Sequence, residues 1–213
     1  MDLIAGSTAE HDEDLVRSIS DVLDHEAPPP HVSCYLLSLE RGTPLSRDPS
    51  RHPDDDVLAR RYELLDAELG DRGYEWYEVS NFAKPGDECV HNRLYWDQGD
   101  YVGLGPAAHG HRSGRRSWNI ASLTAYLDAV ERGERPEAGH EVLDEPARRL
   151  EALSLALRTR RGVDSAWVLR PDGLGDLVVE EEGRLILTLR GRLLADAVLA
   201  SLEMTPEVAE ADH

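Results

Sequence analysis

The sequence has few cysteines, a single lysine and no long apolar segment. Its two cysteines, Cys34 and Cys89, lie far apart and form neither a disulfide framework nor a closely spaced metal-binding pair, which suits a reducing cytosol. The N-terminus lacks the basic and then apolar pattern of a signal peptide, and no apolar run approaches the length of a membrane span. These absences predict a cytoplasmic protein without an integral membrane segment.

Positive charge is also scarce. The 213 residues carry 23 basic and 42 acidic side chains, a formal charge of −19, and such a field repels phosphate backbones and anionic lipid. Nucleic acids are therefore excluded as general partners. The sequence also has no P-loop, no GxGxxG motif and no Ser-His-Asp arrangement, so hydrolase and nucleotide-binding functions have no support. With 40% apolar residues, the chain can form one large domain or two small ones, whose oligomeric state stays open.

The first forty residues predict a strand, a helix and a second strand. Residues 2–5 form a short apolar segment, and Ser7 or Thr8 is placed to cap the helix that follows. The buried stripe of that helix is predicted at i, i+4 and i+8, at Leu15, Ile19 and Leu23. Residues 32–39 are almost continuously apolar, which is typical of a strand buried on both faces of a parallel sheet.

A two-stranded parallel sheet cannot stand alone, because its edges and faces need neighbours. We therefore expect the chain to begin in the middle of a larger fold, as a fragment, a misassigned start or a shortened paralogue would. The alternative is that strands further along the chain complete the sheet.

Further elements follow from periodicity and turn residues. They are a loop at 41–56, helices at 55–73, 123–130 and 145–158, a strand at 74–79 and a linker at 131–140. From residue 164 the elements become short, with a helix near 165–169, strands at 177–179 and 184–188, and a last helix at 190–202. This order predicts a winged-helix-like domain, and because the chain is acidic we favour intramolecular packing over DNA binding. The predicted domains are 1–140 and 141–204, followed by a tail at 205–213.

The segment from Tyr77 to His111 concentrates side chains that can ligate a metal or stack on a flat ring. Its centre is the run His91-Asn92-Arg93-Leu94-Tyr95-Trp96. A neutral imidazole suits iron, and Tyr95 and Trp96 can pack along a porphyrin face while Asn92 fixes the imidazole tautomer. From these residues alone, the favoured interpretation is plainer: His91 and Asn92 cap a turn and the aromatic side chains belong to the core.

Two further histidines flank Gly110. His109 and His111 share a face only in a regular strand, which Gly110 between them disfavours. We take His109 as a second candidate ligand-binding residue and expect His111 to face solvent. Cys89 is interpreted as a small apolar filler.

Several segments together resemble one family. Asp2-Leu3-Ile4-Ala5-Gly6 is similar to a strand-and-glycine motif late in a radical S-adenosylmethionine barrel, and 32–44 resembles the next strand with its E-x-G-T exit. Residues 77–83 (YEVSNFA) and the later H-N-x-x-Y-W run resemble the HemW-type heme chaperones, which are oxygen-independent coproporphyrinogen III oxidase-like proteins. Residues 145–202 resemble the C-terminal domain of that family.

The resemblance implies an α/β fold made of the last βα units of a partial radical-SAM (β/α) barrel, followed by an α+β winged-helix-like domain. It implies heme binding, with His91 as the ligand of the heme iron, and delivery of heme to an acceptor protein. The heme-binding residues that it implies are His91, Asn92, Tyr95, Trp96 and His109. The residues that it places at the edge of an S-adenosylmethionine site are Asp2, Ile4, Gly6 and Ser38.

The sequence also departs from the family. Members carry a Cys-x3-Cys-x2-Cys motif that holds a [4Fe–4S] cluster, whereas two distant cysteines cannot supply three cluster ligands. We therefore expect the C-terminal half of such a protein, a heme chaperone-like chain without radical chemistry of its own. S-adenosylmethionine and the cluster then belong only to full-length members. The alternatives are an oxygen-independent coproporphyrinogen III oxidase or dehydrogenase of porphyrin biosynthesis, and a non-catalytic protein-interaction module.

Overall fold

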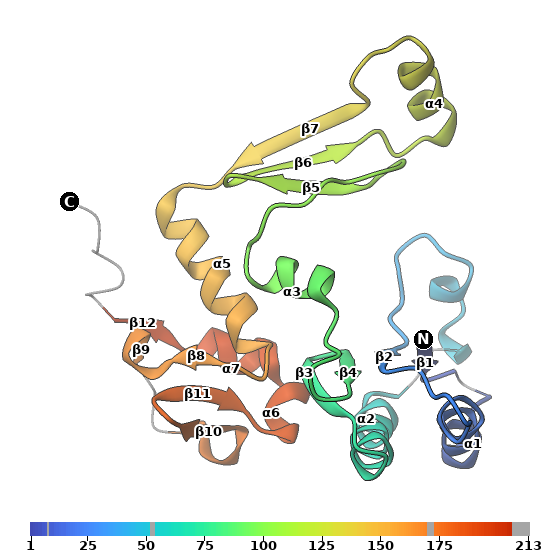
Figure 1. Cartoon of the computed structure of the whole chain (residues 1–213), viewed down its shortest axis with the longest axis vertical. Coiled ribbons are helices and arrows are strands. Elements are labelled where there is room, and N and C mark those ends of the chain that lie inside the picture. Colours follow the sequence, from blue (N-terminus) through green and yellow to red (C-terminus); the bar gives the residue numbers. More distant parts are fainter. Residues whose placement is uncertain (8, 52–53, 170–172, 206–213) are drawn as a thin grey trace. The chain divides into compact units, whose positions relative to one another are not determined.

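The computed structural model describes residues 1–7, 9–51, 54–169 and 173–205 of a mixed α/β protein (Figure 1). Backbone contacts divide the chain into two compact units. The first comprises Met1–Cys89, Leu157–Ser165 and Arg170–Leu202, and the second comprises Val90–Ala156, Ala166–Leu169 and Glu203–His213. Of the predicted tail, only Thr205 lies within the described residues. None of the helices in the described ranges is long and apolar enough to cross a membrane.

The first unit contains a four-stranded sheet of order β1-β2-β4-β3. Its strands are β1 (Asp2–Ala5), β2 (His31–Leu36), β3 (Glu75–Glu78) and β4 (Asn81–Ala83). β1 and β2 are parallel, as predicted, and β4 runs antiparallel to β2 and β3. Later strands therefore extend the sheet, as the alternative interpretation of the first forty residues expected. The described strands form an open sheet and not a closed barrel.

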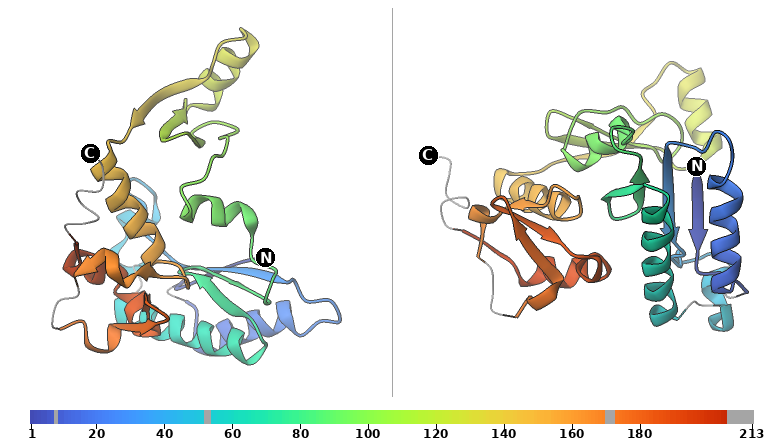
Figure 2. Two further views of the ribbon diagram at one scale, coloured as in Figure 1. Left: turned by 60° about the vertical axis from the view of Figure 1, so that its left-hand side comes forward. Right: turned by 60° about the horizontal axis from the view of Figure 1, so that its bottom comes forward.

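One face of this sheet is covered by α1 (Asp12–Leu23) and α2 (Asp55–Asp71), which run alongside the strands (Figure 2). Strand alternation sends the core side chains of the sheet to that face. The core consists of Ala5, Leu15, Ile19, Leu23, Val32, Cys34, Leu65, Leu69, Tyr74 and Phe82. The predicted buried stripe of α1 is confirmed. Tyr35 is exposed on the other face, so β2 is not buried on both faces as we expected.

Helix caps explain where α1 and α2 begin. The Asp54 carboxylate accepts hydrogen bonds from the amides of Asp56 and Val57, which starts α2 at the predicted place. The predicted cap of α1 at Ser7 is wrong, because the N-cap is His11 and the Asp14 carboxylate accepts from the His11 amide. Thr8, the other predicted cap, lies outside the described residues.

The first unit also holds a small second sheet of order β10-β11-β8, built from β8 (Val163–Asp164), β10 (Val178–Glu181) and β11 (Arg184–Leu187). Glu182 and Gly183, both with positive φ, make the predicted tight turn between β10 and β11. The last helix is not continuous as predicted. It divides into α6 (Leu189–Leu193) and α7 (Ala195–Ser201), because Leu194 leaves helical geometry with φ −116° and ψ 24°.

The second unit carries a three-stranded antiparallel sheet of order β5-β6-β7. Its elements are α3 (Val90–Trp96), β5 (His109–Arg112), β6 (Arg115–Asn119), α4 (Leu123–Glu131), β7 (Glu137–Val142), α5 (Glu145–Leu157) and the short pair β9 (Val168–Leu169) and β12 (Glu203–Met204). The segment 131–140 was predicted as a linker, but its second half belongs to β7. This strand is exposed along most of its length, so its many charged residues and turn formers did not show the alternation of a half-buried strand. The predicted helix near 165–169 is a 3-10 turn at Ser165–Trp167 followed by β9.

Glu78 at the end of β3 gives the first unit a measurable pH dependence. Its side chain is 1% exposed and accepts a hydrogen bond from the Asn81 amide. Burial raises the pKa of this carboxyl above its usual 4.5, although Asn81 acts in the opposite direction. Since the folded-state pKa lies above the unfolded one, the contribution of Glu78 to stability is present below the unfolded pKa and is lost as the pH rises through the folded pKa.

We predict that Glu78→Gln makes the protein more stable than the unaltered chain at pH 7 and removes part of its loss of stability on going from mildly acidic to neutral pH. The amide that this change introduces can also donate to Asn81 Oδ1, a buried atom without a hydrogen-bond partner among the described residues. Urea unfolding of both proteins across this pH range measures the effect. A stability difference that does not change with pH would contradict the assignment to Glu78.

Candidate functional site

Helix α3 carries the H-N-x-x-Y-W residues and brings two of them together. His91 and Tyr95 are four residues apart and therefore lie on the same side of the helix. The Tyr95 hydroxyl and His91 Nε2 are 2.7 Å apart, and the two rings meet edge to face with centroids 4.9 Å apart. Tyr95 is 40% exposed, so this aromatic side chain is not part of the core, in contrast to the plainer interpretation.

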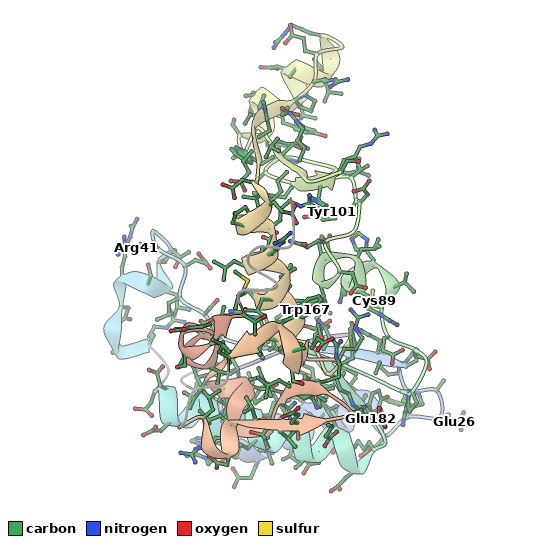
Figure 3. All side chains as sticks on the ribbon, turned by 90° about the vertical axis from the view of Figure 1, so that its left-hand side faces the viewer. Glu26, Arg41, Cys89, Tyr101, Trp167 and Glu182 are labelled. Atoms are coloured by element: carbon green, nitrogen blue, oxygen red, sulfur yellow. The ribbon has the colours of Figure 1, made fainter. Side chains whose placement is uncertain are left out.

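The aromatic contacts continue beyond the helix to Tyr101 and His111. The Tyr95 and Tyr101 ring centroids are 4.4 Å apart, and those of Tyr101 and His111 are 6.2 Å apart. Paired backbone hydrogen bonds of 2.8 and 3.0 Å join Tyr101 to His111 and fix the positions of these two residues relative to each other. We call His91, Tyr95, Tyr101 and His111 the ring cluster; Tyr101 is labelled in Figure 3.

Tyr101 was not among the residues predicted from the sequence. Its position between two predicted site segments was a weak signal, because aromatic side chains near a histidine are usually packing residues. Burial, together with the neighbouring Tyr95 and Glu151, raises the pKa of Tyr101. The hydroxyl therefore stays protonated at neutral pH and can serve as a hydrogen-bond donor.

The prediction that His111 faces solvent is wrong. Its side chain is only 15% exposed, and β5 is a regular strand in spite of Gly110. A Cβ at Gly110 would lie 3.1 Å from the Gly103 backbone nitrogen, so this glycine permits a close approach of two backbone segments. The strand therefore keeps its alternation, and His109 and His111 do share a face.

The hydrogen bond of His111 defines what its ring can bind. Nδ1 lies 2.9 Å from the Gly99 carbonyl oxygen, which can only accept, so Nδ1 carries the proton. Nε2 has no hydrogen bond within the described ranges, and in the neutral ring it presents a lone pair. A backbone carbonyl that orients the ring in this way is the usual support of a metal-binding histidine.

The other predicted heme-contact residues lie near the ring cluster in sequence but outside it. His109 pairs across the β5–β6 ladder with Trp118, and their ring centroids are 6.1 Å apart. Asn92 and Trp96 are half-buried on α3. The structure thus joins His91 and Tyr95 with His111 and Tyr101, while His109 belongs to a separate aromatic pair.

The residues proposed for the edge of an S-adenosylmethionine site all lie in the first unit. Asp2 and Ile4 are on the exposed face of β1, and Ser38 is exposed just after β2. Gly6 is buried with φ +109°, its amide donates to the Glu10 carboxylate, and a Cβ there would overlap Leu58. The close packing of Gly6 against Leu58 of α2 therefore explains why a glycine stands at this position.

The cysteines do not fit an iron–sulfur cluster. Cys34 is buried in the core, where burial raises the pKa of its thiol to about 12, and Cys89 is a half-buried free thiol (Figure 3). Three thiolates are needed to hold a [4Fe–4S] cluster in this family's manner. No group of three or more His, Cys, Asp or Glu side chains within the described part of the chain could hold a metal ion.

Comparison with known proteins gives the family. No family model matches the chain. It is 44% identical over 216 residues to a protein of Mycobacterium tuberculosis named heme chaperone HemW, which covers 95% of this chain. The chain belongs to the HemW family. The HemW of Bacillus subtilis is 31% identical over 221 residues and covers 94% of this chain.

The curated HemW relatives named here are longer than this chain. The chain spans about half of the length of the curated relatives it matches, 54% of the mycobacterial HemW and 58% of that from Bacillus subtilis. Among solved structures, it resembles coproporphyrinogen III oxidase HemN from Escherichia coli, a radical SAM enzyme, with a TM-score of 0.71 and 17% identity. The match covers 94% of this chain and 53% of HemN. At that identity the similarity shows the fold alone.

Proposed function

We propose that this chain binds heme at the ring cluster and passes it to an acceptor protein. The observation that supports the proposal is the grouping of two imidazoles with two tyrosine rings in one unit of a HemW-family protein. Tyrosine rings offer an apolar surface to a tetrapyrrole, and imidazole is a common axial ligand of heme iron. The exposure of Tyr95 also supports transfer, because a site open to solvent can release its ligand to a partner.

We propose His91 as the ligand of the heme iron and His111 as a second imidazole that can bind the iron. In the structure the Nε2 of His91 is engaged by the Tyr95 hydroxyl, so binding through that atom requires Tyr95 to move or to rotate its hydroxyl away. His111 presents its Nε2 without such a competitor. Asn92, Trp96 and His109 remain proposed contacts of the macrocycle, supported by their place beside the ring cluster in the sequence.

The radical chemistry of the family is not assigned to this chain. When bound in a full-length relative, a cluster and S-adenosylmethionine would supply a radical, but the cysteines described above do not fit that cluster. Asp2, Ile4, Gly6 and Ser38 stay proposed as the edge of an S-adenosylmethionine site. An oxidase of coproporphyrinogen III is the alternative function, and it has the fold similarity to HemN in its favour. The third candidate function is that of a non-catalytic protein-interaction module.

We also propose that two parts of the chain correspond to two parts of the family's fold. The parallel β1–β2 pair with α1 and α2 corresponds to the last βα units of a radical-SAM barrel. The strands and helices between 141 and 204 correspond to a winged-helix-like domain, for which the β10–β11 hairpin beside α6 is the supporting feature. The predicted boundaries at 140 and 204 follow from this assignment.

A hemin titration tests the function. We expect the purified chain to give a shifted Soret band that saturates near one equivalent of hemin, and His91→Ala to weaken the binding by at least about tenfold. His25→Ala, which removes an exposed histidine after α1, serves as the matched control and should bind as the unaltered chain does. No saturable band, or equal binding by His91→Ala, would overturn the assignment of the site.

A further inference from the structure

The β5-β6-β7 sheet of the second unit, drawn in Figure 1, carries a second aromatic pair on the same face as part of the ring cluster. His111 lies opposite Arg116 on β6, and His109 lies opposite Trp118. Residues two apart on a strand point to the same side of a sheet, as do residues directly opposite each other. These four side chains therefore share one face, which we call the ring face.

Tyr101 connects the ring face to the rest of the ring cluster. An isolated antiparallel bridge pairs Tyr101 with His111, so the Tyr101 side chain projects to the ring face as well. Tyr101 and His111 form one row of this face, and His109 and Trp118 form the next. The two rows are two residues apart, about 7 Å along the strand, which is less than the width of a tetrapyrrole macrocycle. One flat ligand can therefore contact both rows.

A glycine on β7 determines how the Trp118 indole lies. Gly139 is the partner of Trp118 in the β6–β7 pairing. A Cβ at Gly139 would lie 2.6 Å from the indole carbon Cζ2, so the indole lies across the β7 backbone where a side chain would otherwise stand. The strand thus supports the indole from below and holds it along the sheet.

The Trp118 indole is not enclosed in a core. Trp118 is half-buried, and its neighbour His109 is exposed. The His109 and Trp118 ring centroids are 6.1 Å apart, and their planes are inclined by 33°. A ligand that covers this pair would remove apolar ring surface from water, which favours binding.

The ring face is also hollowed beside His111. His111 and Arg116 line a cavity of about 340 Å³, together with Gln98 and Glu151. Two arginines and two carboxylates lie on its wall, and Arg116 forms ion pairs with Glu141 and Glu151. Because these charges balance, this part of the face has no excess charge with which to recognise a charged group. It favours the uncharged part of a ligand.

We propose that Trp118 is the platform on which the macrocycle of heme stacks, with His109 beside it. This inference rests on the proposed heme-binding function and adds a residue that positions the ring. Stacking on an indole does not require a metal, so the ring face should also bind an iron-free porphyrin. Coordination by His91 or His111 then adds affinity for hemin.

The test compares hemin with iron-free protoporphyrin, followed by Soret absorption and by porphyrin fluorescence. We expect both to bind the unaltered chain with saturation. Trp118→Ala should weaken the binding of both by about tenfold, whereas Trp118→Phe, which keeps a flat ring, should recover most of the loss. Trp167→Ala removes a tryptophan that is 43% exposed and should bind both as the unaltered chain does.

The variant His91→Ala/His111→Ala separates stacking from coordination. It should weaken the binding of hemin far more than that of protoporphyrin, because the iron-free ring has no axial position for an imidazole.

Three results overturn the inference. The first is an unaltered chain that binds hemin but not protoporphyrin. The second is equal binding of protoporphyrin by Trp118→Ala and the unaltered chain. The third is a Trp118→Phe variant that binds no better than Trp118→Ala. All three differ from a failure of the proposed function, in which hemin gives no saturable Soret band even with the unaltered chain.

Discussion

Replacing His91 and His111 together by alanine is expected to eliminate the shifted Soret band that hemin gives with the unaltered chain. Each imidazole reaches the same group of rings from a different element, His91 from α3 and His111 from β5. His91→Ala alone leaves His111 with an Nε2 lone pair in the ring cluster, so some coordination survives. The double variant leaves the ring cluster without an imidazole, and the loss of affinity should reach about 100-fold or more.

The structure offers a matched control for this experiment. His11 and His25 lie at the two ends of α1 in the first unit, and His11→Ala/His25→Ala removes the same number of imidazoles. Retention of the hemin band by this control would show that the effect belongs to the ring cluster. A double variant of His91 and His111 that still gives the full band would remove both residues from the account of iron binding.

Arg192→Met is expected to cause the largest loss of stability. Arg192 on α6 is 4% exposed and lies on the Trp76 ring, with the guanidinium carbon 4.4 Å from the ring centroid. It forms a 2.8 Å ion pair with Asp66 and donates to the Tyr62 hydroxyl, both on α2. Removing one partner of a buried ion pair costs about 3–5 kcal/mol, because the other charge stays behind without compensation. The Asp66 side chain is 25% exposed, so water offsets part of this cost and we expect a loss near the lower end of that range. The midpoint of urea unfolding should fall accordingly.

Arg190→Met provides the comparison. Arg190 is on the same short helix, but it is largely exposed and pairs with the equally exposed Asp176. Exposed pairs contribute about 0–1 kcal/mol, so this variant should unfold almost as the unaltered chain does. If both variants lose stability equally, the helix α6 and not the buried ion pair would be responsible. Combining Arg192→Met with Asp66→Asn should recover part of the loss, because the two charges interact.

Elements with a strong periodic pattern were predictable from the sequence. The α2 helix lies where the apolar spacing that includes Leu65 and Leu69 predicted it, and the β10–β11 turn follows from Glu182-Gly183. Local patterns could not show that β7 pairs with β6, since its outward side chains are polar and its packing is supplied by a neighbouring strand. The last helix was predicted as one element because most of its residues favour helix, and the backbone at Leu194 divides it.

Part of the candidate site was predictable from the sequence, because the spacing of residues within one helix determines which of them meet. The i, i+4 spacing of His91 and Tyr95 predicts their contact once residues 90–96 form a helix. The contribution of Tyr101 and His111 depends on a bridge between two backbone segments, which no spacing in the sequence indicates. Gly110 was interpreted as a break in the strand, whereas its small size is what lets the strand approach Gly103.

The central claim is that heme binds at the ring cluster in the second unit, and its location can be measured directly. Ferric heme is paramagnetic and broadens the backbone signals of nearby residues in a proton–nitrogen correlation spectrum of the labelled chain. We predict that one equivalent of hemin broadens the signals of residues 91–96, 99–103 and 109–118 and leaves those of β1 and β2 sharp. Broadening confined to β1 and β2, around the exposed Ile4 and Tyr35, would contradict the claim.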